Sequence, residues 1–250
     1  MKTKKHVAIV GAGFSGLASA SLLAQAGYKV TLIDKHHKVG GRARQFSADG
    51  FTFDMGPSWY WMPDVFEHFF SLFDQKVEDL YELIRLNPSY QVIFEESTLP
   101  LPADWDSLKN TLDEIEPGAG NQLQEFMDEA AFKYQVGMKD LVYKPGLSPL
   151  EFVNLDVLKG VLKLDVFNSI ASSVRKRFKD PRIIALLEFP VLFLGAKPSQ
   201  TPALYSLMNY ADMKLGTWYP KGGMVKIVEA MEKIAKQQGV EMVLGQEITQ

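Results

Sequence analysis

The stretch that decides the fold is residues 7–42, VAIVGAGFSGLASASLLAQAGYKVTLIDKHHKVGGR. An apolar run at its start, residues 6–10, predicts a buried strand, and the alanine- and leucine-rich run after the glycines predicts a helix. A second apolar run, residues 29–33, predicts another strand. A strand, a tight turn, a helix and a second strand in this order predict the start of a Rossmann-like α/β domain with a parallel sheet.

The glycines of the turn, Gly11, Gly13 and Gly16, have the spacing of a dinucleotide-binding turn. Gly11 permits the sharp turn, Gly13 lets a pyrophosphate approach the backbone, and Gly16 lets the helix pack closely on the sheet. Phe14 and Ser15 begin the helix with Gly16, and the free N–H groups and positive dipole end of a helix start favour phosphate. The turn therefore predicts a bound dinucleotide.

The second predicted strand ends at an acid, Asp34. A carboxylate at this point accepts hydrogen bonds from a ribose and repels a 2′-phosphate, which argues against NADP. A second glycine pair, Gly40 and Gly41, can fold back over the diphosphate, and the Arg42 guanidinium is a candidate partner for it. These residues do not distinguish NAD from FAD.

At this point the chain resembles a known family. Residues 7–42 resemble the flavin-binding start of the amine-oxidase and phytoene-desaturase superfamily. Two further segments, GFTFDMGPSWYWMPDVF at 50–66 and YPKGGMVKIVEAMEKIAKQQGVEMVLGQEI at 219–248, are similar to bacterial-type phytoene desaturases of its carotenoid desaturase branch. The resemblance implies FAD as the cofactor and desaturation of a hydrophobic polyene in carotenoid biosynthesis. It also implies that FAD contacts Lys35, the loop residues Gly56, Pro57 and Ser58, and the backbone of Ile248 in a short strand.

Composition limits the other possibilities. With 250 residues, 46% of them hydrophobic, the chain can bury a large core. The net charge of −3 argues against a nucleic-acid partner, and the absence of cysteine excludes disulfides and thiol catalysis. The four histidines show no two-His metal spacing, so no metal site is predicted. No catalytic residue can be assigned, because Asp140, Asp156 and Asp165 are typical of surface carboxylates.

The middle of the chain predicts a largely helical insertion. We expect residues 1–105 to form the first part of an FAD-binding domain, residues 106–214 a helical substrate or membrane-facing region, and residues 215–250 the return to the FAD-binding domain. Residues 133–182 carry ten Lys or Arg against five Asp or Glu. A basic, apolar helix over 150–170 could lie on an anionic bilayer or be a core helix with a solvated face. Because a polyene substrate must be drawn from lipid, we favour a cytoplasmic protein bound peripherally to the inner face of the membrane.

The patterns also predict individual elements. They are hairpins over 45–53 around Asp49-Gly50 and over 90–101, helices over 64–73, 78–86, 108–115, 123–142, 181–189, 203–213 and 224–236, and a strand over 240–244. Asp106 and Thr201 are the expected N-caps of the helices that follow them.

Several alternatives stay open. The enzyme could be another carotenoid desaturase, a carotenoid isomerase or a flavin amine oxidase, and a different class is a non-catalytic lipid-binding protein with the fold of the GDP-dissociation inhibitors. The resembling family has a further C-terminal portion, so we expect this chain to be part of a longer protein and inactive alone.

Overall fold

The computed structural model describes residues 5–145, 147–148 and 164–249. The chain divides into two compact units, the first comprising Met1–Arg85 with Trp218–Gln250 and the second Leu86–Thr217. The predicted boundaries, after residues 105 and 214, differ from this division. Residues 86–105 belong to the second unit because Leu99 and Leu101 are buried in its core. Most of the predicted basic helix over 150–170 lies outside the described residues.

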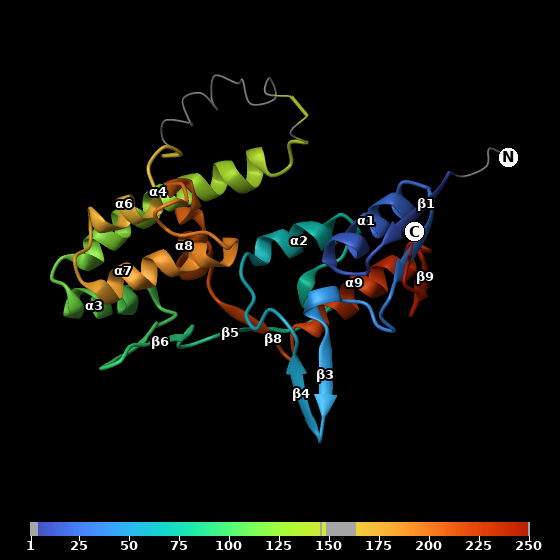
Figure 1. Ribbon diagram of the computed structural model, residues 1–250, viewed down its shortest axis with the longest axis horizontal. Coiled ribbons are helices and arrows are strands. Elements are labelled where there is room, and N and C mark those ends of the chain that lie inside the picture. The colour runs from blue at the N-terminus through green and yellow to red at the C-terminus, as the bar shows by residue number, and fades with distance from the viewer. Residues whose placement is uncertain (1–4, 146, 149–163, 250) are drawn as a thin grey trace. The chain divides into compact units, whose positions relative to one another are not determined.

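The first unit contains the strands and helices of the predicted Rossmann-like part (Figure 1). Its elements are β1 His6–Val10, α1 Phe14–Gln25, β2 Lys29–Asp34, β3 Gln45–Ala48, β4 Phe51–Asp54, α2 Pro63–Ser71, β5 Leu83–Arg85, β8 Trp218–Pro220, α9 Val225–Gln237 and β9 Glu241–Leu244, with 3-10 turns η1 Gly41–Ala43 and η2 Val77–Asp79.

The sheet of the first unit has three parallel strands in the order β1-β2-β9. Helices α1 and α9 pack against each other and bury Leu17, Ile227 and Ile234 together with Leu32 of β2. Fully burying one such side chain contributes about 1.5–3 kcal/mol. The predicted strand β1 is confirmed, but its predicted burial is wrong: it forms an edge of this sheet, and Val10 is 67% exposed.

The hairpin of β3 and β4 projects from the first unit as two adjacent strands (Figure 1). Its turn residues Asp49 and Gly50 both have positive φ, as the predicted Asp-Gly turn requires. At the base of the hairpin, the Asp54 carboxylate accepts hydrogen bonds from the Tyr219 hydroxyl (2.5 Å) and the Met224 N–H (3.2 Å). The hairpin is thereby tied to the segment that leads into α9.

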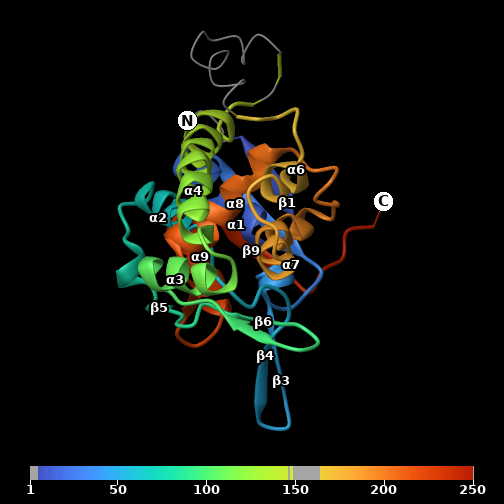
Figure 2. The same ribbon diagram turned by 90° about the vertical axis from the view of Figure 1, so that its left-hand side faces the viewer.

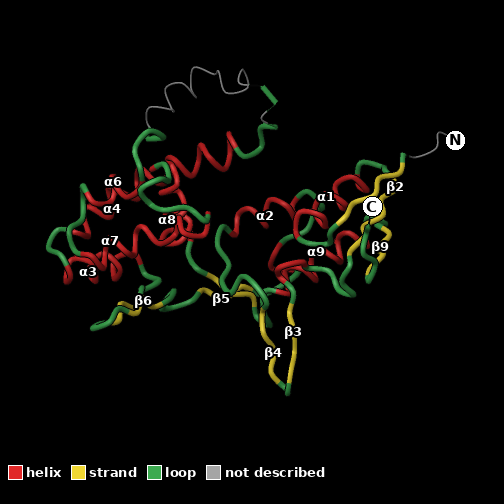
Figure 3. The backbone as a smooth tube through the Cα atoms, viewed as in Figure 1, coloured by secondary structure: helices red, strands yellow, loops and turns green. Residues whose placement is uncertain are grey.

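The second unit is mostly helical, as the tube coloured by secondary structure shows (Figure 3). Its described elements are β6 Gln91–Ile93, β7 Thr98–Pro100, α3 Trp105–Ile115, α4 Ala119–Gln135, the π-helix η3 Val136–Leu141, α6 Ile170–Arg175, α7 Pro181–Glu188, η5 Phe189–Leu194, η6 Ala203–Ser206, α8 Leu207–Tyr210 and the π-helix η7 Ala211–Leu215. Helix α4 contacts both α3 and α8, and α6 contacts α7 (Figure 2).

One apolar core holds the second unit together. It contains Leu112 of α3, Phe126 of α4, Val174 of α6 and Leu186 of α7, all almost completely buried. A buried polar group lies beside this core: the Asp212 carboxylate accepts hydrogen bonds from the Tyr90 hydroxyl (2.5 Å) and from the Thr217 hydroxyl (2.8 Å). Burial and the neighbouring carboxylate both raise the pKa of Tyr90 well above its ordinary value.

Three local predictions are wrong. The predicted helix over 78–86 is instead a 3-10 turn followed by β5, because Leu83–Arg85 pairs with β8. The N-cap of α3 is Asp104, whose carboxylate accepts from the Ser107 N–H, and not Asp106. Thr201 does not cap the next helix, because its hydroxyl donates to the Lys197 carbonyl.

Candidate functional site

A cavity of about 1250 Å³ opens in the first unit where the sequence predicted the dinucleotide. Its wall is made by the end of β1, the glycine turn, the start of α1, the end of β2, the second glycine pair and two loop segments at 55–57 and 246–248. The structure brings the following predicted contact residues to this wall: Gly11, Gly13, Phe14, Ser15, Gly16, Asp34, Lys35, Gly41, Arg42, Gly56, Pro57 and Ile248. Ser58, the other predicted residue, is exposed and does not line the cavity.

The glycine turn has the conformation that its sequence requires. Gly11 has a φ of +103°, which favours glycine. A Cβ on Gly16 would lie 1.8 Å from the Gly11 carbonyl oxygen, so only glycine fits where α1 meets the turn. Gly13 is the N-cap of α1, with no side-chain cap and no acidic residue in the first turn of the helix. The first N–H groups of α1 therefore face the cavity without a competing carboxylate.

The second glycine pair lies against this turn. The Gly40 N–H donates to the Ala12 carbonyl at 2.7 Å. A Cβ on Gly41 would lie only 3.1 Å from the Gly13 Cα. The close approach of the two segments leaves the N-terminus of α1 lined by backbone rather than by side chains.

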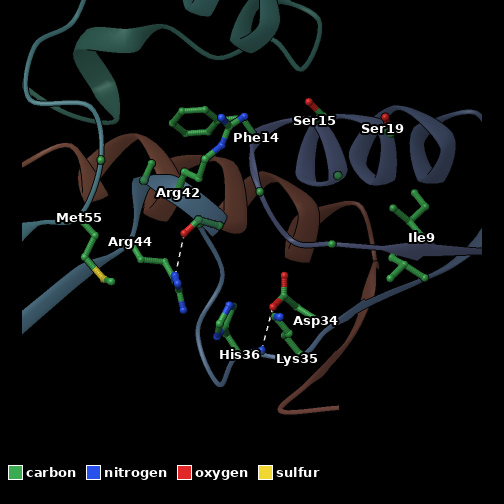
Figure 4. Close-up of a pocket in the computed structure, with 18 of the residues that line it drawn as sticks. Ile9, Phe14, Ser15, Ser19, Asp34, Lys35, His36, Arg42, Arg44 and Met55 are labelled. Atoms are coloured by element: carbon green, nitrogen blue, oxygen red, sulfur yellow. Dashed lines mark hydrogen bonds between the residues drawn. The ribbon is translucent and has the colours of Figure 1, made fainter. Parts of the chain in front are cut away.

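Asp34 is almost completely buried at the end of β2. Its carboxylate oxygens accept hydrogen bonds from the Ala12 N–H (2.7 Å) and the His36 N–H (2.8 Å; Figure 4). Burial alone raises the pKa of Asp34, but these two N–H groups, together with the smaller effects of the charges of His36 and Arg44, outweigh it and hold the pKa below its ordinary value. Asp34 is therefore ionised at neutral pH and can only accept hydrogen bonds.

The segment that brings Ile248 to the cavity is attached to the end of β2. The Gly245 N–H donates to the His36 carbonyl at 2.9 Å, and the Gln246 N–H donates to the Asp34 carbonyl at 3.0 Å. The short strand predicted around Ile248 is not formed: residues 246–249 have no regular secondary structure. Ile248 itself is 54% exposed.

The cavity wall also contains residues that the sequence analysis did not select, among them Val10, His36, Arg44 and Met55. Val10 and His36 adjoin the predicted turn and acid, so position in the sequence alone could have suggested them. No local spacing indicates Arg44, because its backbone is held by the Met55 N–H. Among the described residues, no group of three or more His, Asp or Glu is arranged to hold a metal ion.

These features fit a dinucleotide. The glycine turn leaves space where a Cβ would block an anion, the helix N-terminus supplies donors, and Asp34 supplies acceptors for a ribose. The fold and this cavity define a dinucleotide-binding protein of the Rossmann-like class.

Comparison with known proteins gives the family. Residues 14–250 match the family described as flavin containing amine oxidoreductase, and the chain belongs to that family. The match confirms the predicted cofactor, FAD, and the predicted relation to the amine oxidase superfamily.

Curated relatives bear names from carotenoid chemistry. The chain is 37% identical over 238 residues to "Carotenoid 3,4-desaturase" of Haloarcula japonica, covering 94% of this chain and 48% of the relative. It is 34% identical over 245 residues to "4,4'-diapophytoene desaturase (4,4'-diaponeurosporene-forming)" of Staphylococcus aureus, covering 98% and 49%. A "4,4'-diapolycopene oxygenase" of Methylomonas sp is 35% identical, with coverage of 98% and 50%. The chain thus spans about half the length of these relatives.

Solved structures confirm the predicted fold class. A triple mutant of putrescine oxidase superposes with a TM-score of 0.60 at 19% identity, covering 97% of this chain and 50% of that one. The RAB GDI of Plasmodium falciparum superposes with a TM-score of 0.58 at 14% identity, covering 99% and 60%. At these identities the likeness shows the fold alone.

Proposed function

We propose that this chain carries the FAD-binding unit of an enzyme that desaturates a carotenoid-type polyene. One observation carries the proposal: a flavin-family chain folds its glycine turn, its acid and its second glycine pair around one cavity. The names of the curated relatives, two desaturases and one oxygenase of carotenoids, support the substrate class.

The residues of the cavity each have a task in holding FAD. The N–H groups at the start of α1, from Phe14 to Gly16, are placed to bind the diphosphate. Asp34 is placed to accept from the hydroxyls of the adenosine ribose. Lys35, Arg42 and the loop at 56–57 complete the wall. FAD bound there would supply a hydride acceptor for the substrate, whose second hydrogen would leave as a proton.

A polyene hydrocarbon gives a protein no polar group to bind, so the enzyme must orient it by apolar contact and exclude water. Met213, Tyr205 and Tyr210 pack in or against the apolar core of the second unit. We assign no substrate-contact residue and no catalytic base.

We infer that the protein contacts the membrane peripherally, on the cytoplasmic face, to reach such a substrate. Phe167 is 87% exposed and Val142 is 55% exposed in the segments on either side of residues 149–163. Moving exposed aromatic and aliphatic side chains from water into the boundary between lipid headgroups and acyl chains is favourable, because it removes apolar surface from water. Of the nearby cations, Arg175 and Arg177 are paired with Glu188 and Glu129, so Lys176 and Lys179 are the better candidates for lipid phosphate. None of the described helices is both long and apolar enough to cross a membrane.

A non-catalytic lipid-binding role is the competing class, because the same fold occurs in the RAB GDI. The match to the flavin family and the intact glycine turn with Asp34 favour the enzyme. An absorption spectrum of the complete gene product separates the two classes. We expect a flavin band in the blue region, and a protein that stays colourless after incubation with excess FAD would contradict the proposal.

The substrate is tested by anaerobic incubation of the flavin-loaded protein with phytoene in liposomes and an added two-electron acceptor, followed by chromatography. We expect products with additional conjugated double bonds. Parallel incubations with 4,4'-diapophytoene, with a carotenoid already desaturated along its chain and with an aliphatic amine distinguish the related desaturases and the amine oxidases. Turnover of the amine alone would contradict the proposed substrate class.

A further inference from the structure

The side chain of Arg44 is held in one position by its surroundings. The Arg44 carbonyl accepts a hydrogen bond from the Met55 N–H at 2.9 Å, which fixes its backbone at the root of the β3–β4 hairpin. Its Nε donates to the Gly41 carbonyl at 2.7 Å (Figure 4). Its stem passes close to Gly40, where a Cβ would lie 3.3 Å from the Arg44 Cγ. The guanidinium is therefore oriented before any ligand arrives.

Arg44 lies on the same cavity wall as the two predicted parts of the cofactor site, the glycine turn and the acid Asp34. The carbonyl that holds Arg44 belongs to Gly41, which packs closely on Gly13, the N-cap of α1. Arg44 and Asp34 line the same cavity (Figure 4). Arg44 thus lies at the phosphate-binding turn and on the wall that also contains the acid.

The Arg44 guanidinium also has N–H groups that make no hydrogen bond to the described residues of the protein. Within the described residues, Arg44 uses only its Nε–H, and its Nη atoms make no hydrogen bond to the protein. Arg42, the arginine that the sequence suggested, is exposed, and its side chain extends away from Asp34 toward Phe14 (Figure 4). Arg44 is the arginine on this wall that the protein itself holds in place.

We propose that Arg44 is a cofactor-binding residue that pairs with the phosphate adjoining the adenosine of FAD. This inference rests on the proposed function. A guanidinium offers two parallel N–H groups to a phosphate, and a donor that is already oriented loses less conformational entropy on binding. The Nε–H bond to Gly41 provides that orientation, and the free Nη groups provide the contact.

The test measures cofactor affinity directly. The apoprotein of the complete gene product is titrated with FAD, and the quenching of flavin fluorescence gives Kd. The variants are Arg44→Met, which keeps the stem and removes the charge, and Arg44→Lys, which keeps the charge and removes the planar fork. Lys233→Met is the matched control, because Lys233 is an exposed cation on α9 of the same unit that does not line the cavity. ADP and adenosine serve as competitors in each titration.

We expect Arg44→Met to weaken FAD binding about 10- to 100-fold, Arg44→Lys to weaken it less, and Lys233→Met to leave it unchanged. The preference for ADP over adenosine should shrink in Arg44→Met while the affinity for adenosine stays the same, which a merely structural role would not produce. If the wild type binds FAD and Arg44→Met binds it equally well, the assignment of Arg44 is wrong and the proposed function stands. If the wild type binds neither FAD nor ADP, both are wrong.

Discussion

Replacing two glycines of the same turn by alanine, one at a time, should separate folding from cofactor binding. A Cβ on Gly16 would lie 1.8 Å from the Gly11 carbonyl oxygen and 3.0 Å from its carbon. Backbone atoms cannot rotate away, so α1 must move from the turn. A Cβ on Gly13 would meet nothing closer than the Gly41 Cα at 3.9 Å, which is an ordinary contact, and its φ of −82° suits alanine.

The magnitudes follow from these distances. Overpacking costs about 1–3 kcal/mol and sometimes more, and a clash with backbone belongs at the upper end. Alanine favours a helix interior over glycine by about 1 kcal/mol, so Gly16→Ala should still lose roughly 2 kcal/mol or more. In a chain of this size that lowers Tm by about 4–8 °C. Gly13→Ala changes only an N-cap and should cost less than about 1 kcal/mol.

The assay combines thermal unfolding of the apoprotein with titration of FAD. Gly13→Ala should melt close to the wild type yet bind FAD at least about tenfold more weakly, because its methyl group occupies the approach of the diphosphate. Gly16→Ala should lose stability before any ligand is added. The two variants control for each other, since the chemical change is identical. Wild-type melting of Gly16→Ala, or wild-type FAD affinity of Gly13→Ala, would refute the reasoning.

Three further changes test other parts of the chain. Asp34→Asn should lower the free energy of unfolding by about 1.5–3 kcal/mol at neutral pH. Because the folded pKa of Asp34 lies below its unfolded value, the difference from wild type should vanish in urea titrations as the pH falls from about 3.9 through the folded pKa; a constant difference would contradict this. Tyr90→Phe should cost about 1–3 kcal/mol in urea unfolding by removing a donor to buried Asp212, whereas Tyr205→Phe, whose hydroxyl has no hydrogen bond among the described residues, should cost less. Phe167→Ser should reduce cosedimentation with anionic vesicles at unchanged stability, and equal cosedimentation would argue against membrane contact there.

Sequence reasoning succeeded where the determinants are local. The turn from β1 to α1 depends on Gly11, Gly13 and Gly16, which lie within six residues, and Asp34 follows at the end of the adjacent strand. The Asp49-Gly50 turn also determines its own conformation, with both residues at positive φ. In each case the residues that determine the conformation lie within the turn itself or at the end of the adjacent strand. Their spacing in the sequence is therefore enough to predict the structure.

The sequence patterns gave wrong predictions where the structure of a segment depends on residues far away in the chain. Residues 78–86 have the apolar spacing of a helix, but the pairing of Leu83–Arg85 with Trp218–Pro220 makes that segment a strand. The cap of α3 shows a different limit, because Asp104 and Asp106 flank the same tryptophan and only the extended backbone of Asp104 lets it cap. The two compact units divide after residue 85 rather than after the predicted residue 105, because the hairpin of β6 and β7 buries Leu99 in the core of the second unit.

The two arginines that line the cavity illustrate the difference between local and long-range determinants. Arg42 lies inside the 3-10 turn of Gly41–Ala43, whereas Arg44 follows it in extended conformation and is fixed by Met55 across the hairpin. The register of that hairpin pairs Gln45 with Asp54. Asp54 is in turn bonded to Tyr219 and Met224 near the other end of the chain. The position of Arg44 at the cofactor wall therefore depends on contacts with residues that no local motif includes, which explains why the motif indicated Arg42 and the structure indicates Arg44.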